Sequence, residues 1–474
     1  MASSSTSVIE LEPVQLTALP AHNSDEKKQS AEFYDDAPHY AASAAEQGGM
    51  SPSPLPSTAV DVMPSWNNPR SNIARVAACF WSFTVMGSND AAYGPLIPYI
   101  QDHYSLSYLI VSLIFLSPFA GYMTSAVLND WMHRTIGQRG VGFVSSVCHL
   151  VAYGVIAAHP PYPVLVVAFI IAGLGNGLAD AAWNAWIGSM ARANEVLGFL
   201  HGLYGFGAVL APLISTSMIT RAGLPWYAFY YVMMGMATIE IIVITSCFWK
   251  ADAQEYKESM ARHSSSSSSS ATSNSARGTI KEALLKKPAA RVTWMCALLL
   301  LGYVGLEVAL GGWIVEFMIQ VRGGEPFASG MTNTGFWLGI TIGRFVLGFV
   351  TPRIGEKRAV SIYLLISIGC ELLFWLVPQF IVSAVAVGLI GVFLGPVFAS
   401  VIVVMSKLLP RHLHVGAIGF AAACGSSGAA VLPFAVGAIA QAKGVQVLQP
   451  VILALLVIVL GIWVALPRIE KKEE

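Results

Sequence analysis

Twelve long apolar segments dominate the sequence and constrain its fold more than any other feature. A helix needs about 20 mainly apolar residues to cross the hydrocarbon core of a bilayer. Only 11% of the residues are charged, whereas soluble proteins carry roughly 25%. The sequence therefore predicts an all-α polytopic membrane protein with twelve transmembrane helices. The predicted helices are 73–99, 107–130, 140–158, 163–190, 199–220, 225–249, 290–317, 327–350, 359–377, 380–408, 414–440 and 445–466.

Polar stretches divide these segments into two sets of six. Residues 1–70 are rich in Ser and Pro and lack helical periodicity, so we expect a disordered tail. Residues 250–289 contain seven consecutive serines and are expected to form a flexible linker. The predicted organisation is therefore two six-helix halves, 71–249 and 290–466, with a second short tail at 467–474.

The positions of the basic residues predict the orientation in the membrane. Cytoplasmic loops carry an excess of Lys and Arg. With both termini in the cytoplasm, the loops on the opposite side hold three of the 27 basic residues, Arg221, Arg322 and Lys443. We therefore expect both termini and the linker to be cytoplasmic. The membrane itself, plasma or vacuolar, stays open.

Short sequence echoes indicate that the two halves are repeats. Gly207–Pro212 in the fifth segment resembles Gly428–Pro433 in the eleventh, and basic loops at 137–139 and 355–358 follow the second and eighth segments. Such a repeat predicts two halves related by an axis along the membrane normal. Glycines spaced by four let helices approach and slide, which suits rocking of the halves. They are Gly173, Gly177, Gly335, Gly339 and Gly343.

This pattern resembles the major facilitator superfamily over residues 73–466, and within it the fucose–proton symporter group. The stretches that carry the resemblance are Asn89-Asp90 through Pro98, Asp180 to Asn184, His201 to Gly205, Gly305-Leu306-Glu307 through Trp313, and Gly343-Arg344. The loop signature after the second helix departs from the family pattern because it lacks the usual opening glycine. The resemblance implies a pseudo-symmetric major facilitator fold and transport by alternating access coupled to protons.

Asp180 is the first candidate for proton coupling. An ionised side chain at the bilayer centre costs from about 2.5 to more than about 10 kcal/mol, so those that persist usually face a cavity. Asn176, Asp180 and Asn184 are spaced by four and share one helix face. This stripe is either a cavity wall or a hydrogen-bonded seam between helices. The resemblance favours the wall, because fucose-type symporters carry an acid four residues before an asparagine here.

Asp90 and Glu307 are the further coupling candidates. Asp90 follows Asn89 and precedes Tyr93 in the first segment, and Glu307 lies six residues before Trp313 in the seventh. For each acid, a structural hydrogen bond is the alternative to a role in transport. Glu316, near the outer end of its helix, is expected to be solvated. The resemblance places Glu240 and Glu371 on helices outside the cavity, so we expect them to be structural.

Other polar, aromatic and basic residues complete the predicted site. His201 and Tyr204 share a face of the fifth helix, where a proton relay and a packed polar contact are equally open. Arg344 lies near the inner end of the eighth helix, which predicts a gating ion pair. The predicted cavity residues are Asn89, Tyr93, Asn176, Asn184, His201, Tyr204, Trp313 and Trp337. The predicted gating residues are Arg134, Arg139, Arg344 and Arg353.

The predicted function is secondary transport of a small solute, a sugar or related metabolite, driven by protons. A P-loop, an HExxH motif and a G-x-S-x-G motif are all absent from the sequence, which argues against an ATP-driven pump or an enzyme. The formal net charge is zero, so no basic field attracts nucleic acid. We expect a monomer without metal or cofactor. An exporter of drugs or secondary metabolites and a non-transporting nutrient sensor remain alternatives.

Overall fold

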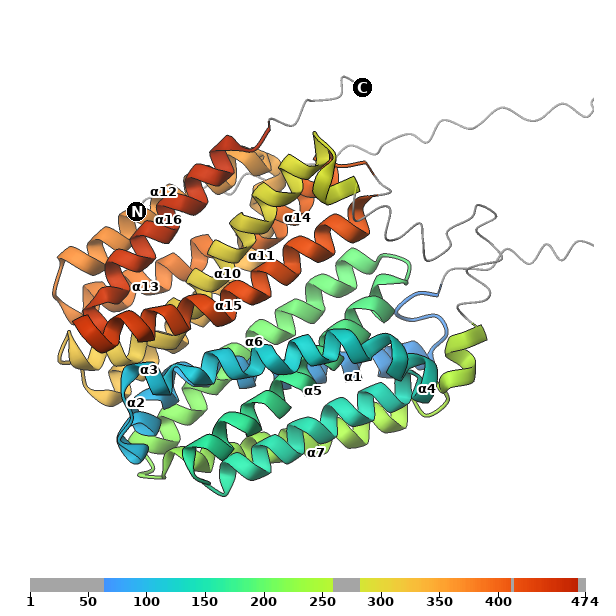
Figure 1. Cartoon of the computed structure of the whole chain (residues 1–474), viewed down its shortest axis with the longest axis horizontal. Helices are drawn as coiled ribbons and strands as arrows, with labels where there is room; N and C mark the ends of the chain where they lie inside the picture. Colours follow the sequence, from blue (N-terminus) through green and yellow to red (C-terminus); the bar gives the residue numbers. More distant parts are fainter. Residues whose placement is uncertain (1–63, 259–281, 411–412, 468–474) are drawn as a thin grey trace, which may run out of the picture. The chain divides into compact units, whose positions relative to one another are not determined.

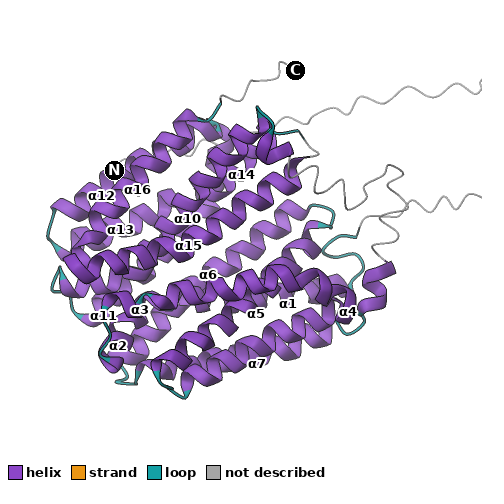
Figure 2. Ribbon diagram, in the orientation of Figure 1, coloured by secondary structure: helices purple, strands orange, loops and turns teal. Residues whose placement is uncertain are grey.

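The computed structural model describes residues 64–258, 282–410 and 413–467, which are helical apart from short connections (Figures 1 and 2). The first half consists of α1 (Ser71–Ala91), α2 (Tyr93–Tyr104), α3 (Tyr108–Val111), α4 (Leu113–Ala157), α5 (Tyr162–Gly188), α6 (Ala193–Thr220), the short 3-10 helix η1 (Trp226–Ala228) and α7 (Phe229–Cys247). The second half consists of α10 (Ala289–Gln320), α11 (Pro326–Ile354), α12 (Glu356–Leu376), α13 (Phe380–Leu394), α14 (Val397–Leu408), α15 (His414–Lys443), the 3-10 helix η3 (Val445–Val447) and α16 (Leu448–Ala465).

Ten helical stretches of the described residues are long and apolar enough to cross a membrane. The prediction of twelve is consistent with this number. Helix α4 has 45 residues, or about 68 Å, which is twice the thickness of the hydrocarbon core. It therefore contains two spans. The other missing span is residues 71–104, where α1 is too polar and α2 too short to count separately.

The structure joins or interrupts the predicted helices at three places. The loop expected at 131–139 is helical except at Gly137, whose φ of 69° and ψ of −178° suit glycine alone. The first helix is interrupted at Ala92, because Pro95 has no N–H to donate to the carbonyl of Ala91. The tenth helix is likewise divided at Pro396 into α13 and α14.

The bundle has two ends, which we name by their connections. Residues 250–258 and 282–288 lie at the right-hand end in Figure 1, and we call this end the linker face. The turns after α2, α6 and α10 lie at the opposite end, the far face. The expected cytoplasmic side is the linker face. Residues 253–258 of the predicted flexible linker are helical, while the serine run 264–270 and residues 1–63 of the predicted tail lie outside the described residues.

Glycines bring the backbones of α1 and α6 into direct contact. A Cβ at Gly87 would collide with the carbonyl oxygen of Tyr204, and one at Gly207 would collide with the backbone of α1. The second half repeats this contact, since a Cβ at Gly428 of α15 would collide with the carbonyl of Leu301 in α10. The sequence echo between the fifth and eleventh helices thus marks the same helix crossing in both halves.

The four-residue glycine stripes also pack helices inside each half. Gly173 of α5 lies against the backbone of Pro118 in α4, and Gly339 and Gly343 of α11 lie against the backbone of α13. These stripes therefore bring helices of the same half together, and their suitability for rocking of the halves stays a prediction. Their contacts make each half a tightly packed unit.

The two halves meet closely at the far face. Gly94 of α2 lies against the carbonyl of Gly311 in α10, and Gly312 lies against the ring of Phe115 in α4. The Tyr108 hydroxyl of α3 donates to Glu316 of α10 at 3.0 Å. The expectation that Glu316 is solvated was wrong, because it is 2% exposed in this contact.

We predict that replacement by alanine changes protein stability differently at two helical glycines, Gly207 and Gly461. Gly207→Ala should lower the free energy of unfolding by about 1–3 kcal/mol, because the new methyl group overpacks the contact with α1. Gly461→Ala is the control, since this glycine of α16 is exposed and has open space around it. Alanine there should be neutral or stabilising by up to about 1 kcal/mol. Thermal unfolding of the purified proteins measures both; equal melting temperatures would contradict the packing argument.

Candidate functional site

Asp90 lies near the end of α1 at the centre of a polar cluster in the first half. Its Oδ1 atom accepts hydrogen bonds from Asn89 Nδ2 at 3.0 Å and from Asn176 Nδ2 of α5 at 2.9 Å. Its Oδ2 atom accepts one from the Tyr204 hydroxyl of α6 at 2.8 Å. Three side chains thus donate hydrogen bonds to the carboxylate. The close contact of α1 with α6 brings Tyr204 within reach.

Asn89 extends this cluster to Tyr93 at the start of α2. Its Nδ2 also donates to the hydroxyl of Tyr93 at 2.9 Å, while its Oδ1 has no partner among the described residues. Tyr93 is buried and packs edge-on against the rings of Phe115 and Phe169, at centroid distances of 6.1 and 5.4 Å. The predicted cavity residues Asn89 and Tyr93 therefore lie directly beside Asp90.

A chain of buried groups continues from Asn176 away from Asp90. The Asn176 Oδ1 atom is 2.9 Å from Nε2 of His149 in α4. Nδ1 of His149 is 2.8 Å from Oε2 of Glu240 in α7, and both side chains are at most 1% exposed. Glu240 Oε1 accepts a 2.6 Å hydrogen bond from the Ser82 hydroxyl. His149 was not among the predicted site residues, because it stands alone in an apolar segment. Its partners come from other helices.

The polar stripe of α5 divides into two parts. Asn176 is fully buried and joins the Asp90 cluster. Asp180 and Asn184 are partly exposed, and the Asn184 side chain donates to Asp180 Oδ1 at 2.8 Å. Four residues of helix place Asp180 about 6 Å from Asn176 along the axis, toward the linker face. Asp180 therefore lies closer to the linker face than Asn176, which holds Asp90, and both acids are partly exposed.

Glu307 and Arg344, predicted separately, form one ion pair in the second half. Nη2 of Arg344 in α11 lies 3.0 Å from Oε1 of Glu307 in α10. The Glu307 side chain is 7% exposed and that of Arg344 is 25% exposed. A permanently charged guanidinium therefore compensates this carboxylate.

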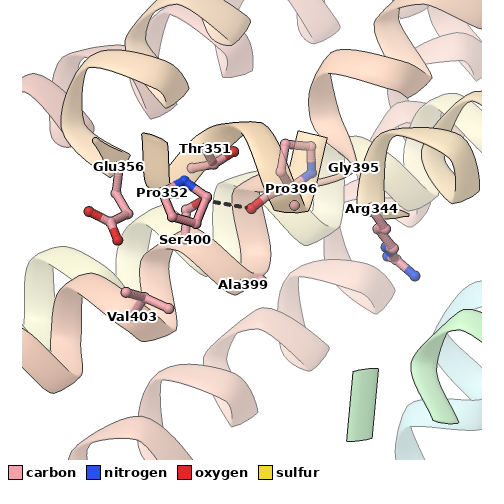
Figure 3. Close-up of a pocket in the computed structure, with 10 residues that line it drawn as sticks. Arg344, Thr351, Pro352, Glu356, Gly395, Pro396, Ala399, Ser400 and Val403 are labelled. Carbon is pink, nitrogen blue, oxygen red and sulfur yellow. Dashed lines mark hydrogen bonds between the residues drawn. The ribbon is translucent and has the colours of Figure 1, made fainter. Parts of the chain in front are cut away.

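Arg344 also borders a pocket of about 120 Å³ in the second half (Figure 3). Figure 3 shows its guanidinium at one end of the pocket and the Glu356 carboxylate at the other. Glu356 is paired with Lys407 of α14 at 2.6 Å. The pocket is lined by Arg344, Gly348, Thr351, Pro352, Glu356, Gly395, Pro396, Ala399, Ser400 and Val403. Its charged groups are therefore already compensated.

The other predicted cavity residues have different surroundings. Trp313 is fully buried and donates its indole N–H to the carbonyl of Pro433 at 2.9 Å. Trp337 is buried and its indole N–H has no partner among the described residues. His201 is exposed and contacts the ring of Phe83 at 5.5 Å, whereas Tyr204 binds Asp90. His201 and Tyr204 therefore have separate partners in this structure.

Asn333 is a further residue that the sequence analysis missed. It lies one turn before Trp337 in α11, it is fully buried, and neither Oδ1 nor Nδ2 has a partner among the described residues. Its amide lies against Gly94 of α2, across the contact between the halves. The spacing of Asn333 and Trp337 by four in an apolar segment was the available signal.

The predicted gating arginines outside the bundle centre make surface contacts. Arg134 pairs with Asp130 at 3.0 Å, with both side chains more than 60% exposed. Arg139 donates to the carbonyl of Trp249 at 2.9 Å and lies over its ring at 4.8 Å. Arg353 is exposed in the last turn of α11. These contacts lie within one half, and their gating role stays a prediction.

Metal binding has no support in the described part of the chain. No group of three His, Cys, Asp or Glu side chains there is arranged to hold a metal ion. The six cysteines are all free thiols in this structure.

The sequence matches the profile of the Major Facilitator Superfamily in two overlapping regions, residues 79–332 and 308–474. Together they span both halves. The chain belongs to the Major Facilitator Superfamily. It is therefore a multi-pass membrane transporter and not an enzyme, as predicted.

Individual relatives of this superfamily transporter support the same fold. Bypass of stop codon protein 6 of Saccharomyces cerevisiae is 29% identical over 422 residues, which cover 84% of each chain. The glucose/mannose transporter GlcP of Bacillus subtilis is 20% identical over 397 residues, covering 82% of this chain and 94% of that protein. The crystal structure of a D-xylose–proton symporter matches with a TM-score of 0.67 and 14% identity, covering 84% of this chain and 98% of the other.

We predict that the Glu307–Arg344 pair must be changed as a unit. Arg344→Gln should lower the free energy of unfolding by about 3 kcal/mol, because it leaves a buried carboxylate without its cation. The double variant Arg344→Gln/Glu307→Gln should recover most of that loss. Arg134→Gln is the control, since an exposed pair contributes at most about 1 kcal/mol. Additive losses in the double variant, measured by thermal unfolding, would show that the pair is not coupled.

Proposed function

We propose that this transporter carries a sugar or related small polar solute together with protons, by alternating access between its two halves. The observation that carries the proposal is the Asp90 carboxyl group, which is held inside the first half by three neutral donors. A carboxyl group without a fixed cation can be neutralised by a proton, because desolvation disfavours its charged form. The names of two relatives, a D-xylose–proton symporter and a glucose/mannose transporter, agree with this class of solute.

The proposed proton step uses two acids at different depths. Both acids are partly exposed, and Asp180 lies closer to the linker face, so in this proposal it exchanges protons with water on that side. Asp90 lies about one turn deeper, beside Asn89 and Tyr93. Opening of the far face would give Asp90 access to protons from the other side. Glu307, which is paired with Arg344, would contribute fixed charge to the second half.

Buried polar atoms without partners among the described residues support a hydroxyl-rich solute, and those of Asn333 lie at the contact between the halves. Asn89 Oδ1 belongs to α1, while Asn333 Oδ1 and Nδ2 and Trp337 Nε1 belong to α11. A buried polar group without a hydrogen bond costs about 1–3 kcal/mol. A sugar presents donors and acceptors that would satisfy these atoms, whereas an apolar drug would leave them unpaired. The same atoms therefore favour sugar transport over the export of apolar compounds.

The proposed alternating access starts from a state that is closed at the far face. The backbone contact of Gly94 with Gly311, the contact of Gly312 with the Phe115 ring and the Tyr108–Glu316 hydrogen bond join the halves there. Separation of the halves at this face would break that hydrogen bond and uncover Asn333. In this cycle the unpaired atoms of Asn333 acquire partners when the solute binds.

We predict that proton coupling is lost in Asp180→Asn, which keeps the shape of the side chain but removes its titration. In proteoliposomes, the variant should not accumulate D-glucose in response to a pH gradient. It should retain exchange of labelled for unlabelled D-glucose at equal pH, where no net proton transfer is needed. Asp90→Asn should behave in the same way.

The matched control is Asp102→Asn, an exposed acid in the last turn of α2. This variant should retain gradient-driven accumulation. Full accumulation by Asp180→Asn would remove Asp180 from the coupling mechanism and leave Asp90 as the coupling acid. Absence of any D-glucose or D-xylose movement in the wild-type protein would favour the sensor or exporter alternatives.

We predict that Asn333→Leu separates stability from solute binding. The variant removes two unpaired buried polar atoms, so the closed state should melt at an equal or higher temperature. The loss of a solute hydrogen bond should raise the half-saturating concentration of D-glucose by about tenfold. Thr332→Val is the control on the same helix, because its hydroxyl already donates to the carbonyl of Ala328. Unchanged saturation in Asn333→Leu would place the solute elsewhere.

A further inference from the structure

His149 and Glu240 form a buried acid–base pair that the proposed transport cycle has not used. The pair lies inside the first half, between α4 and α7, where neither side chain is more than 1% exposed. Taking two charges out of water is expensive, and a well-packed apolar pair of similar volume is often as stable. The pair is nevertheless connected to Asp90 through the single side chain of Asn176. This connection suggests a function in proton binding.

The hydrogen-bond directions along this chain follow from the chemistry of the groups. Asn176 donates through Nδ2 to the Asp90 carboxylate, so its Oδ1 faces His149. An amide oxygen accepts only, and Nε2 of His149 must therefore carry a hydrogen. The remaining proton lies between Nδ1 of His149 and Oε2 of Glu240, 2.8 Å apart.

This shared proton has two positions. On Glu240 it leaves a neutral acid and a neutral imidazole; on Nδ1 it gives a carboxylate and an imidazolium. The Ser82 hydroxyl donates to Glu240 Oε1 at 2.6 Å and itself accepts from the indole N–H of Trp183 at 3.1 Å. Both contacts stabilise the carboxylate and so favour the imidazolium.

The titratable groups around the pair come from three helices. Asp90 faces it from α1 through Asn176, and the Tyr153 ring of α4 stacks on His149 at 5.8 Å. Tyr230 of α7 lies 6.0 Å from Tyr153. The group that faces it from α5 is the Asn176 amide, which does not titrate. Of these facing groups, Asp90 is the one whose charge changes during the proposed cycle.

We propose that His149 and Glu240 are positioning residues for proton binding at Asp90. They hold the Asn176 amide with its donor toward Asp90, and their shared proton moves onto His149 when Asp90 is ionised and back toward Glu240 when Asp90 is protonated. Each movement breaks one bond to hydrogen and forms another, so no proton leaves the pair. This inference rests on the proposed exchange of a proton at Asp90.

The test is an infrared pH titration of the purified full-length protein in detergent. The infrared C=O stretch of protonated carboxyl groups is followed as the pH changes, in the wild-type protein and in each variant. Each measurement is repeated with Asp90→Asn added, and the difference between the two gives the titration of Asp90. The method needs no solute. A wild-type protein that titrates at Asp90 but moves no D-glucose would therefore count against the proposed function and not against this inference.

His149→Gln and Glu240→Gln should shift the Asp90 titration in opposite directions. Loss of the imidazolium makes the surroundings more negative, so Asp90 should bind protons about tenfold more tightly. Loss of the Glu240 carboxylate leaves the imidazolium uncompensated, so proton affinity should fall by about the same factor. The double variant removes both charges and should return close to wild type. A role in packing alone would lower the melting temperatures without opposite shifts.

If His149→Gln or Glu240→Gln prevents folding, Ser82→Ala is a milder variant that tests the same proposal. It removes the hydroxyl that stabilises the Glu240 carboxylate without removing a charge. The shared proton should then lie closer to Glu240, and Asp90 should bind protons about threefold more tightly, as expected from a weaker neighbouring positive charge. Shifts of the same sign in His149→Gln and Glu240→Gln, or an unchanged midpoint in Ser82→Ala, would overturn the proposal.

Discussion

Burial inside the bundle governs how its polar groups are arranged. Each polar side chain there must find partners on neighbouring helices, because burial without a hydrogen bond costs more than the bond itself contributes. Asp90 meets this requirement with donors from Asn89, Asn176 and Tyr204. The amide atoms of Asn333 do not meet it, and they lie where the two halves touch. Satisfied groups therefore hold a half together, and under the proposed function the unpaired amide of Asn333 marks a position at which a solute would bind.

Helix packing supplies the distances that these hydrogen bonds need. Tyr204 reaches Asp90 because Gly87 and Gly207 allow the backbones of α1 and α6 to touch. The same crossing occurs between α10 and α15 at Gly428, so the repeat preserves the scaffold of each half. The side chains attached to that scaffold differ. The first half presents carboxyl groups with neutral donors, and the second presents a carboxylate with a guanidinium.

Local sequence patterns predicted the helices of the fold better than they predicted the contacts between side chains. Apolar length located the spans, and the four-residue spacing of Asn176 and Asp180 correctly placed them on one face of α5. The pairing of His149 with Glu240 was not predictable in this way, because the two residues lie 91 positions apart on different helices. Glu316 was wrongly expected to be solvated for a related reason: its partner, Tyr108, belongs to the other half. Side-chain partners across helices depend on the rotation of each helix, which hydropathy does not specify.

The proposed division of labour between the halves follows from the chemistry of the two partner cations. Arginine stays protonated in proteins, so the charge of Arg344 is fixed and Glu307 beside it remains compensated throughout a transport cycle. Histidine gains and loses a proton near neutral pH, so the charge on His149 can change when a nearby carboxyl group changes its own. The arginine of the second half therefore gives a constant electrostatic field, and the histidine of the first half gives one that can change. Under the proposed function, proton exchange therefore belongs to the first half, and the second half supplies the constant charge against which that exchange takes place.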